Sequence, residues 1–339
     1  MVKRQGKYTL RFETCPQIQG FASVAGEKES KGPLGSEFHR IIYDPRAGCP
    51  TFEQGESRFQ QEALSLALEH SGHKGDELDF VFAGDLLNQC VSSSFALGAF
   101  SAPYLGQYGA CSTMAQALIM SAVFVESGAA NLAAAVTSSH FASAERQYRF
   151  PLDYGAVRTP TAQRTVTGSG ACVVGKGSNA SLPVIEAATV GRIVDPGVTD
   201  ANNMGAAMAQ AAADTLLRYF EDTGEETESF DGIFTGDLGF VGSQILLELL
   251  NKEGLCIDKL HNDCGKMIFY REEQDVHAGG SGCGCAASVL CSHLLRKFVS
   301  GEYKNILFMA TGALMSPTSS QQGLSIPSVA HLVKICAPR

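Results

Sequence analysis

The sequence predicts an α/β protein in which a mainly parallel sheet is covered by helices, with one plan built twice along the chain. Short apolar segments alternate with helical segments, which is typical of layered α/β folds. Two apolar segments end in the same Gly-Asp-Leu string, at Asp85 and at Asp237. A turn of small residues, a helix, a Ser-Gly stop and an apolar strand run from Gly109 to Ser139, and the same series runs from Gly282 to Gly312. The repeat therefore predicts two equivalent halves.

Helices are expected where apolar residues recur at helical spacing, and strands where short apolar runs are bounded by turn residues. The helices are predicted over 58–71, 112–126, 205–221, 243–253 and 285–299. The strands are predicted over 80–83, 131–137, 171–175, 184–190, 232–235, 305–310 and 329–336. The runs 132–136 and 306–310 are apolar at every position, which favours strands buried on both faces. We assign 1–195 to the first half and 196–339 to the second, with the boundary inside 191–203.

The segment 141–164 is irregular and has no counterpart in the second half. Its charged residues are mostly arginines, namely Arg146, Arg149, Arg158 and Arg164 against Glu145 and Asp153. Irregular insertions on a repeated scaffold often form binding surfaces. We expect a binding lid or a partner surface here, and a loop that merely covers the sheet or makes a subunit contact is the alternative.

Composition and charge exclude several classes of protein. Hydrophobic residues make up 45% of the chain and charged residues 18%, a balance that favours a compact fold over disorder. The net charge of −9 provides no basic surface for a phosphate backbone, so we expect no nucleic-acid partner. The 11 cysteines are scattered without Cys-x-x-Cys pairs, which argues against a disulfide framework and a structural zinc site and indicates a reducing compartment.

The chain shows no targeting segment. Its start, MVKRQGKYTLRF, lacks the apolar run of a signal peptide, so synthesis in the cytoplasm is expected. No stretch is continuously apolar over the ~18 residues that a membrane span needs. The nearest approach, 114–139, is interrupted by Glu126 and a Ser-Gly pair, and we expect a buried helix, a turn and a buried strand.

Three polar residues follow secondary-structure elements in the first half. Cys111 lies at the predicted start of a helix, where amide dipoles favour a thiolate or a bound anion, although a cysteine among small residues is often packing material. Asp85 and His140 follow buried strands, at the edge where ligands bind in open α/β sheets. Asp85 as a helix N-cap and His140 as a structural histidine are the alternatives. The second copy keeps Asp237 but lacks equivalents of Cys111 and His140, so any chemistry is confined to one half.

The second half contributes His261, in the string His-Asn-Asp-Cys-Gly, and a glycine-rich run over 279–285. Glycines before a helix allow close approach of a ligand or of another helix. The run lacks the Gly-Lys-Ser/Thr of a phosphate-binding loop and does not match the dinucleotide fingerprint.

These features together resemble the thiolase-like superfamily, whose condensing enzymes use a cysteine nucleophile with a histidine and either an asparagine or a second histidine. Cys111 matches the nucleophile and His261 matches the histidine, whereas Cys283 stands where asparagine is expected. The resemblance implies a layered α/β/α/β/α fold of two duplicated halves with a degenerate, non-enzymatic site. An acyl-CoA condensing or acyltransferase enzyme that uses Cys111 is the alternative.

Within that superfamily the chain is identified as a member of the stage V sporulation protein AD family. The strings that carry this resemblance lie at 83–89, 109–113, 137–140, 144–147, 165–170, 211–215, 261–265 and 278–282. The family implies binding of dipicolinic acid (pyridine-2,6-dicarboxylate), free or as its calcium chelate, during uptake in sporulation and release in germination. It further implies membrane proteins of the same operon as partners, a peripheral place at the inner membrane of the forespore and spore, and a homodimer joined through the edge of the first-half sheet.

The resemblance also implies a ligand site with no cofactor and no resident metal. Asp85, Cys111 and His140 are its expected centre, with Asn88, Thr113 and Arg146 around it. Amides at 111–113 would hold one carboxylate, while His140 or Arg146 would supply a charge-assisted hydrogen bond. Asp85 would contribute an oxygen if calcium enters with the ligand. A scaffold that docks a membrane channel through 141–164 is a third reading.

Overall fold

The computed structural model describes residues 1–148, 158–177 and 179–338, and its strands form two arms of one hydrogen-bonded path. The first arm has the order β3-β9-β7-β5-β6 and the second has the order β10-β15-β14-β11-β12. A single residue pair, Gln17 with Val184, joins β3 to β10 between the arms. The first arm comprises β3 (Gln17–Gly26), β5 (Phe80–Gly84), β6 (Tyr104–Gly106), β7 (Leu132–Ser139) and β9 (Gly168–Gly175). The second comprises β10 (Val184–Thr189), β11 (Gly232–Thr235), β12 (His261–Asp263), β14 (Asn305–Ala313) and β15 (Ser328–Cys336).

The two arms match strand for strand in order and direction, which confirms the predicted duplication. In each arm the central strand, β7 or β14, runs parallel to the strand on one side and antiparallel to the strand on the other. The sheets are therefore mixed rather than mainly parallel as predicted. A fully buried strand is apolar whichever way its neighbour runs, so hydrophobic pattern does not reveal direction. The change of arm falls between β9 and β10, whereas the predicted bounds of the halves stay a prediction.

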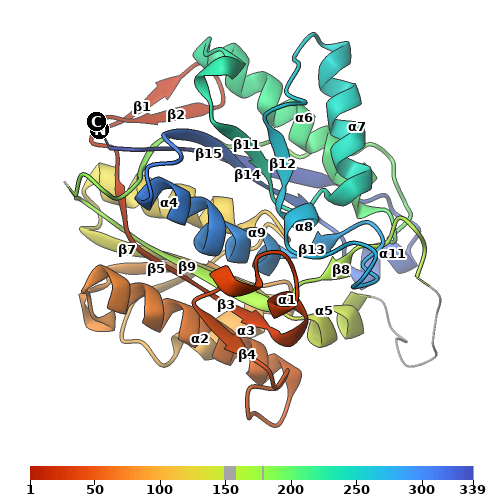
Figure 1. Cartoon of the computed structure of the whole chain (residues 1–339), viewed down its shortest axis with the longest axis horizontal. Coiled ribbons are helices and arrows are strands. Elements are labelled where there is room, and N and C mark those ends of the chain that lie inside the picture. Colours follow the sequence, from red (N-terminus) through yellow and green to blue (C-terminus); the bar gives the residue numbers. More distant parts are fainter. Residues whose placement is uncertain (149–157, 178, 339) are drawn as a thin grey trace.

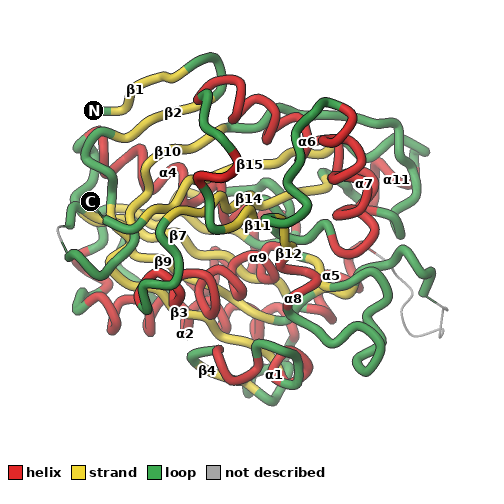
Figure 2. Tube along the Cα trace, turned by 45° about the horizontal axis from the view of Figure 1, so that its top comes forward, coloured by secondary structure: helices red, strands yellow, loops and turns green. Residues whose placement is uncertain are grey.

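Helices and sheet arms alternate in five layers (Figures 1 and 2). Between the arms lie α4 (Thr113–Ser127) and α9 (Cys283–Val289), which continues through a π-helical turn, Leu290–Leu294, into α10 (Leu295–Val299). α2 (Phe52–Ser71) and α3 (Val91–Leu97) cover the outer face of the first arm. α6 (Met204–Thr223) and α7 (Gly239–Lys252) cover the outer face of the second. This is the layered thiolase-like architecture that the resemblance implied.

Most predicted elements are present, and the errors lie at their ends. α2 begins at Phe52 rather than at residue 58, because the Thr51 side chain accepts a hydrogen bond from the Gln54 amide and caps a polar first turn. β7 and β14 extend past their predicted ends through small and polar residues. The part of 141–164 that begins at Phe141 is helical, as α5 (Phe141–Tyr148), whereas Arg149 and Asp153 lie outside the described residues.

The sequence analysis did not predict β3, a ten-residue strand, nor β6, β12 and α3. It did not predict the remaining short elements either. They are α1 (Glu27–Ser30), α8 (Cys264–Met267), α11 (Pro317–Gln321), β1 (Val2–Gln5), β2 (Thr9–Phe12), β4 (Arg40–Ile42), β8 (Arg164–Thr165) and β13 (Gly280–Ser281). β8 and β13 pair with each other in a separate small sheet, which ties the insertion to the glycine-rich run of the second half.

The central helix α4 is the most apolar helical segment. The 18 residues Ala110–Ser127 are long and apolar enough to cross a membrane by length and composition, and 72% of them are buried inside the molecule. α4 ends at Gly128, in a left-handed conformation, and β7 follows. The predicted sequence of buried helix, turn and buried strand is thus confirmed.

Candidate functional site

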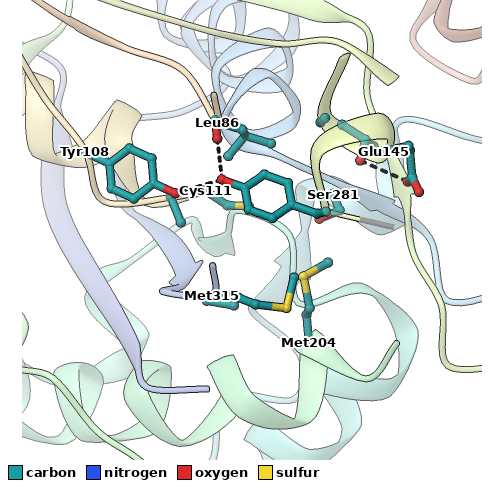
Figure 3. A pocket seen from close by; sticks show the side chains of 12 residues that line it. Leu86, Tyr108, Cys111, Glu145, Met204, Ser281 and Met315 are labelled. Atoms are coloured by element: carbon teal, nitrogen blue, oxygen red, sulfur yellow. Dashed lines mark hydrogen bonds between the residues drawn. The ribbon is translucent and has the colours of Figure 1, made fainter. Parts of the chain in front are cut away.

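A small cavity lies beside Cys111, where the turn before α4 meets α5 and the second half (Figure 3). Its cavity volume is about 40 Å³, which is room for a few water molecules. Its walls are mostly apolar, with two tyrosines, two methionines and one carboxyl group. The lining residues are Leu86, Tyr108, Ala110, Cys111, Ala144, Glu145, Tyr148, Thr165, Met204, Ser281, Ala313 and Met315.

The turn before α4 holds Cys111 at the cavity in a strained backbone. Ala110 has a φ of 50°, in the left-handed region that residues other than glycine rarely adopt. Position 109 requires glycine, because a Cβ there would lie 2.5 Å from the Ser112 hydroxyl oxygen. α4 begins at Thr113, two residues beyond Cys111. The strain is found where the chain presents a functional side chain, as is common at binding sites.

The Cys111 thiol interacts with the carboxylate of Asp237, which follows β11 in the other half. Burial, and then the negative charge of Asp237, raise the pKa of Cys111 well above its ordinary value. The predicted stabilisation of a thiolate by the helix amides is thus outweighed by desolvation and by a nearby anion. The group next to the candidate nucleophile Cys111 is the Asp237 carboxylate. Cys111 is therefore a protonated thiol at neutral pH.

Asp237 is fully buried and its oxygens are saturated with donors. It accepts hydrogen bonds from the Thr311 hydroxyl at 2.8 Å, from the Gly282 amide at 2.8 Å and from the Ser281 hydroxyl at 3.1 Å. Sequence reasoning recorded Asp237 as the copy of Asp85 and missed its contact with Cys111. The repeat itself was the available signal, because it showed that the chain needs a carboxylate at this point of both halves.

Asp85 does not line the cavity. It is fully buried and accepts hydrogen bonds from the Leu87 amide at 2.9 Å, the Ser93 amide at 2.7 Å and the Ser93 hydroxyl at 2.6 Å. These bonds fix the turn that leads from β5 into α3. Asp85 thus binds amides of the turn and of the first turn of α3 without being the N-cap residue of that helix, which is Cys90. The predicted ligand contact of Asp85 stays a prediction.

His140 is also separated from the cavity and satisfied by protein groups. Its Nε2 donates to the Pro45 carbonyl at 2.7 Å, and its Nδ1 accepts from the Ala142 amide at 3.1 Å. Its ring packs against Phe52 with centroids 5.5 Å apart. Burial lowers the pKa of His140 to about 4, so the ring is neutral and offers no charge to an anion at neutral pH.

The other predicted residues are dispersed. Asn88 is exposed, and its backbone N–H donates to the Gln147 side chain. Thr113 is buried, with its hydroxyl donating to the Ala110 carbonyl at 2.6 Å. The exposed Arg146 forms an ion pair with Glu53. None of these three appears among the described cavity residues.

His261 lies on the edge strand β12, away from the described lining of the cavity. Its Nε2 donates to the Thr235 hydroxyl at 2.9 Å, and that hydroxyl donates to Asp263 at 2.6 Å. Burial, and then the charge of Lys266, lower the pKa of His261 to about 4. No histidine is among the described residues that line the cavity.

Cys283, the predicted replacement for asparagine, does lie next to Cys111. The two cysteines share an apolar cluster with Leu86 and Ala144. The Cys283 thiol donates to the Ser138 carbonyl at 2.9 Å, and burial raises its pKa well above its ordinary value. The structure therefore brings Cys111 and Cys283 together, while Asp85, His140 and His261 stay apart from them.

Two tyrosines close the cavity from the first half. The Tyr108 and Tyr148 hydroxyls are 2.9 Å apart, and the Tyr148 hydroxyl also donates to the Leu86 carbonyl (Figure 3). Met204 and Met315, from the second half, face them across the space. Local sequence did not identify these residues, because they come from four separate segments that meet only in the folded chain.

The cavity wall holds one acid and no described cation. The Thr165 hydroxyl donates to Glu145 at 3.2 Å. Over the described ranges, no group of three or more His, Cys, Asp and Glu residues is arranged to hold a metal ion.

A model of one protein family matches residues 6–336, and its description is stage V sporulation protein AD. The stage V sporulation protein AD of Bacillus subtilis (strain 168) is 40% identical over 330 residues, which is 97% of both chains. The chain belongs to the stage V sporulation protein AD family. The matched residues cover both halves of the chain and every site residue described in this section.

The chain shares its fold with proteins of known structure. Cerulenin-bound OleA from Xanthomonas campestris superimposes with a TM-score of 0.60 at 13% identity, over 96% of this chain and 97% of that one. The 3-oxoacyl-[acyl-carrier-protein] synthase III of Aquifex aeolicus VF5 gives a TM-score of 0.55 at 14% identity, over 95% and 99%. At such identities the likeness establishes the thiolase-like fold alone.

Proposed function

We propose that the chain is a non-enzymatic binding protein that holds dipicolinate, as its calcium chelate, in the cavity beside Cys111. It would serve the uptake of dipicolinate in sporulation and its release in germination. Membership of the stage V sporulation protein AD family supports a role in the spore. The observation that carries the proposal is the cavity at the fold's candidate nucleophile, where burial and the carboxylate of Asp237 keep the Cys111 thiol protonated.

The charges of the cavity favour the chelate over the free dianion. A buried anion without a partner is costly, and the described wall supplies Glu145 but no cation. Dipicolinate with one bound calcium ion is neutral overall. Calcium takes 6–8 oxygen ligands in typical sites. The Glu145 carboxylate and the Tyr108 and Tyr148 hydroxyls are the oxygen donors at hand.

The size of the cavity requires the wall to move when the ligand enters. A volume of about 40 Å³ does not hold a flat ring with two carboxylates. Met204 and Met315 form part of the wall, and methionine side chains change shape at low cost.

Calorimetry with a cavity-filling variant tests this proposal. We expect saturable binding of calcium dipicolinate that Ala144→Leu weakens at least tenfold, because the added side chain fills the space beside Cys111. Ala129→Leu, at an exposed turn, makes the same change away from the cavity and keeps binding. A folded protein that does not bind the chelate, or equal binding by both variants, would contradict the proposal.

Asp85 is unsuitable for that test. Truncation to alanine leaves the buried amides of Leu87 and Ser93 without an acceptor, at ~1–3 kcal/mol for each unpaired group. A loss of binding in Asp85→Ala would therefore report a damaged turn as readily as a lost ligand contact.

The second candidate function is acyl transfer through Cys111, and only the fold shared with OleA and the synthase favours it. A nucleophilic cysteine needs activation, usually a depressed pKa or a histidine base, whereas burial and Asp237 raise the pKa of Cys111 and no histidine is among the described residues that line the cavity. Intact-mass spectrometry after incubation with acyl-CoA donors separates the two functions. A stable acyl adduct at Cys111 would establish the enzyme and overturn the binding protein.

We further propose a homodimer that acts beside the spore membrane through membrane proteins of the same operon. β6 ends the strand path of the first arm, and the exposed apolar residues Phe95, Leu105 and Tyr108 lie on or near it. Such an edge suits pairing with a second copy. Leu105→Lys should convert a dimer into a monomer in analytical ultracentrifugation, and a monomeric parent protein would overturn the dimer. If the chain is instead a pure scaffold, Ala144→Leu should leave its role in dipicolinate uptake unchanged. Reversing the charges of Arg158 and Arg164 should then abolish that role.

A further inference from the structure

A second cleft, separate from the Cys111 cavity, lies between α1, the loop before α2, α5 and β8. It has a volume of about 290 Å³, near the lower end for small-molecule sites. Lys28 comes from α1, Arg164 from β8, and Phe52, His140 and Phe141 supply aromatic walls. The sequence analysis noted Arg164 only as part of the arginine-rich insertion.

The Arg164 guanidinium lies in this cleft without a counter-ion. It stacks on the Phe141 ring, 3.8 Å from the centroid, but within the described residues it forms no ion pair and no side-chain hydrogen bond. Its Nε is buried and has no partner. Stacking on a ring compensates a cation only weakly compared with a carboxylate, and it leaves the in-plane N–H groups free to bind an anion.

Lys28 adds a second positive charge that is likewise not paired with any described residue. Burial and then the positive charge of Arg164 lower the pKa of Lys28. The negative charge of Glu29 raises it, but the net effect is a lowering. Glu29 and Asp275 favour the charged forms of both cations and Glu145 favours that of Arg164, but no ion pair joins an acid to Lys28 or Arg164 among the described residues. Glu27 is ion-paired with Lys31, and burial raises the pKa of Glu29 to about 7. Two cations held together in a half-buried cleft repel each other, and an anion bound between them would remove that cost.

The backbone fixes this arrangement on both sides. Arg164 and Thr165 are neighbours in β8, which pairs with β13, and neighbouring side chains of a strand point to opposite faces. Arg164 therefore lines the cleft while Thr165 lines the Cys111 cavity. α5 is shared in the same way, with Phe141 at the cleft and Tyr148 at the cavity.

We propose that the Lys28–Arg164 cleft is a second binding site, specific for a small planar organic anion that it holds by a carboxylate. Lys28 and Arg164 bind the carboxylate, and the flat walls made by Phe52, His140 and Phe141 pack against the ring. Phosphate offers the same charge but no flat surface. This site needs no calcium, which distinguishes it from the cavity beside Cys111.

Isophthalate (benzene-1,3-dicarboxylate) is the probe, because it has the planar dicarboxylate shape without a ring nitrogen to bind calcium. We expect saturable binding to the full-length protein in calorimetry with EDTA present. Arg164→Gln and Lys28→Gln should each weaken it at least tenfold. Lys252→Gln removes one positive charge at the exposed end of α7, outside the cleft lining, and should leave binding within twofold.

The outcomes separate this site from the proposed chelate site. Ala144→Leu, which fills the other cavity, should leave isophthalate binding unchanged, so a failure of the chelate proposal does not affect the test. Absence of isophthalate binding by the folded protein would overturn the second site. Tighter binding of inorganic phosphate than of isophthalate would overturn its assignment to planar carboxylates, and an equal loss in Lys252→Gln would overturn its location between Lys28 and Arg164.

Discussion

At the scale of single residues, the environment of Cys111 determines whether this residue is a nucleophile or only part of the cavity wall. Cys111 was predicted as a candidate nucleophile from its place before a helix. In the structure this residue is 5% exposed and its thiol interacts with the carboxylate of Asp237. The contrast with the exposed Cys256 makes the difference measurable.

Cys111 should resist alkylation in the folded protein. At pH 7.5, iodoacetamide should modify Cys256 at least a hundredfold faster than Cys111, because the reactive thiolate is scarce at Cys111 and access is blocked. Peptide mass spectrometry over time measures both rates. Equal rates in folded protein would show that Cys111 is an activated, accessible thiol.

A buried acid behind Asp85 gives a second residue-scale prediction. Glu56 accepts hydrogen bonds from the Ser138 and Ser143 hydroxyls, both at 2.8 Å. Burial, and then the charge of Asp85, raise the pKa of Glu56 from 4.5 to about 8. Between these pH values the native state keeps a proton that the unfolded chain releases, so this contribution to stability is full below pH 4.5 and is lost as pH rises towards 8.

Glu56→Gln should therefore gain stability relative to the parent protein as pH rises. The difference in unfolding free energy should change in favour of the variant by up to ~1.4 kcal/mol per pH unit across this window. Urea denaturation of both proteins at pH 5, 6.5 and 8 measures it, and contributions from groups that do not interact with Glu56 cancel in the comparison. A constant difference would contradict a raised pKa for Glu56.

At the scale of elements, α9 packs against the first arm at a distance that only glycine allows. A Cβ at Gly284 would lie 2.4 Å from the Gly168 carbonyl oxygen and 2.6 Å from the Ser139 amide nitrogen. Both contacts are backbone atoms of central strands, which cannot turn aside. The missing side chain lets α9 bring Cys283 to Cys111.

Gly284→Ala should destabilise the protein by at least ~1–3 kcal/mol, the usual cost of overpacking. Gly98→Ala, at the end of α3, is the matched control, because its Cβ would come no closer than 3.7 Å and its backbone is helical. That variant should be neutral or slightly stabilised. Thermal unfolding of both compares them, and equal melting temperatures would contradict the close packing of α9.

At the scale of the whole molecule, the two halves share one core. The largest apolar cluster combines α4 and β7 of the first half with α9 and β14 of the second. Each arm buries one face against the central helices, so neither half can separate without exposing them (Figure 2).

The chain should consequently unfold in one cooperative step. Hydrogen exchange should give the amides of α4, β7 and β14 the same opening free energy, equal to that of global unfolding in urea. Distinct transitions for 1–183 and 184–338 would show that the halves are independent domains.

The sequence by itself determined the duplication and most long elements, because strand and helix periodicities are local properties. The resemblance to condensing enzymes, rather than local pattern, set Cys283 beside Cys111, and the two lie in one apolar cluster. The sequence did not reveal the antiparallel neighbours in each sheet, since a buried strand is apolar in either direction. Nor did it show which carboxylate reaches Cys111. Asp85 and Asp237 are each the middle residue of a Gly-Asp-Leu string. Asp85 accepts hydrogen bonds within its own turn and from α3, whereas Asp237 interacts with the Cys111 thiol. Only the tertiary structure decided between them, because that contact joins residues from opposite halves across the central layer.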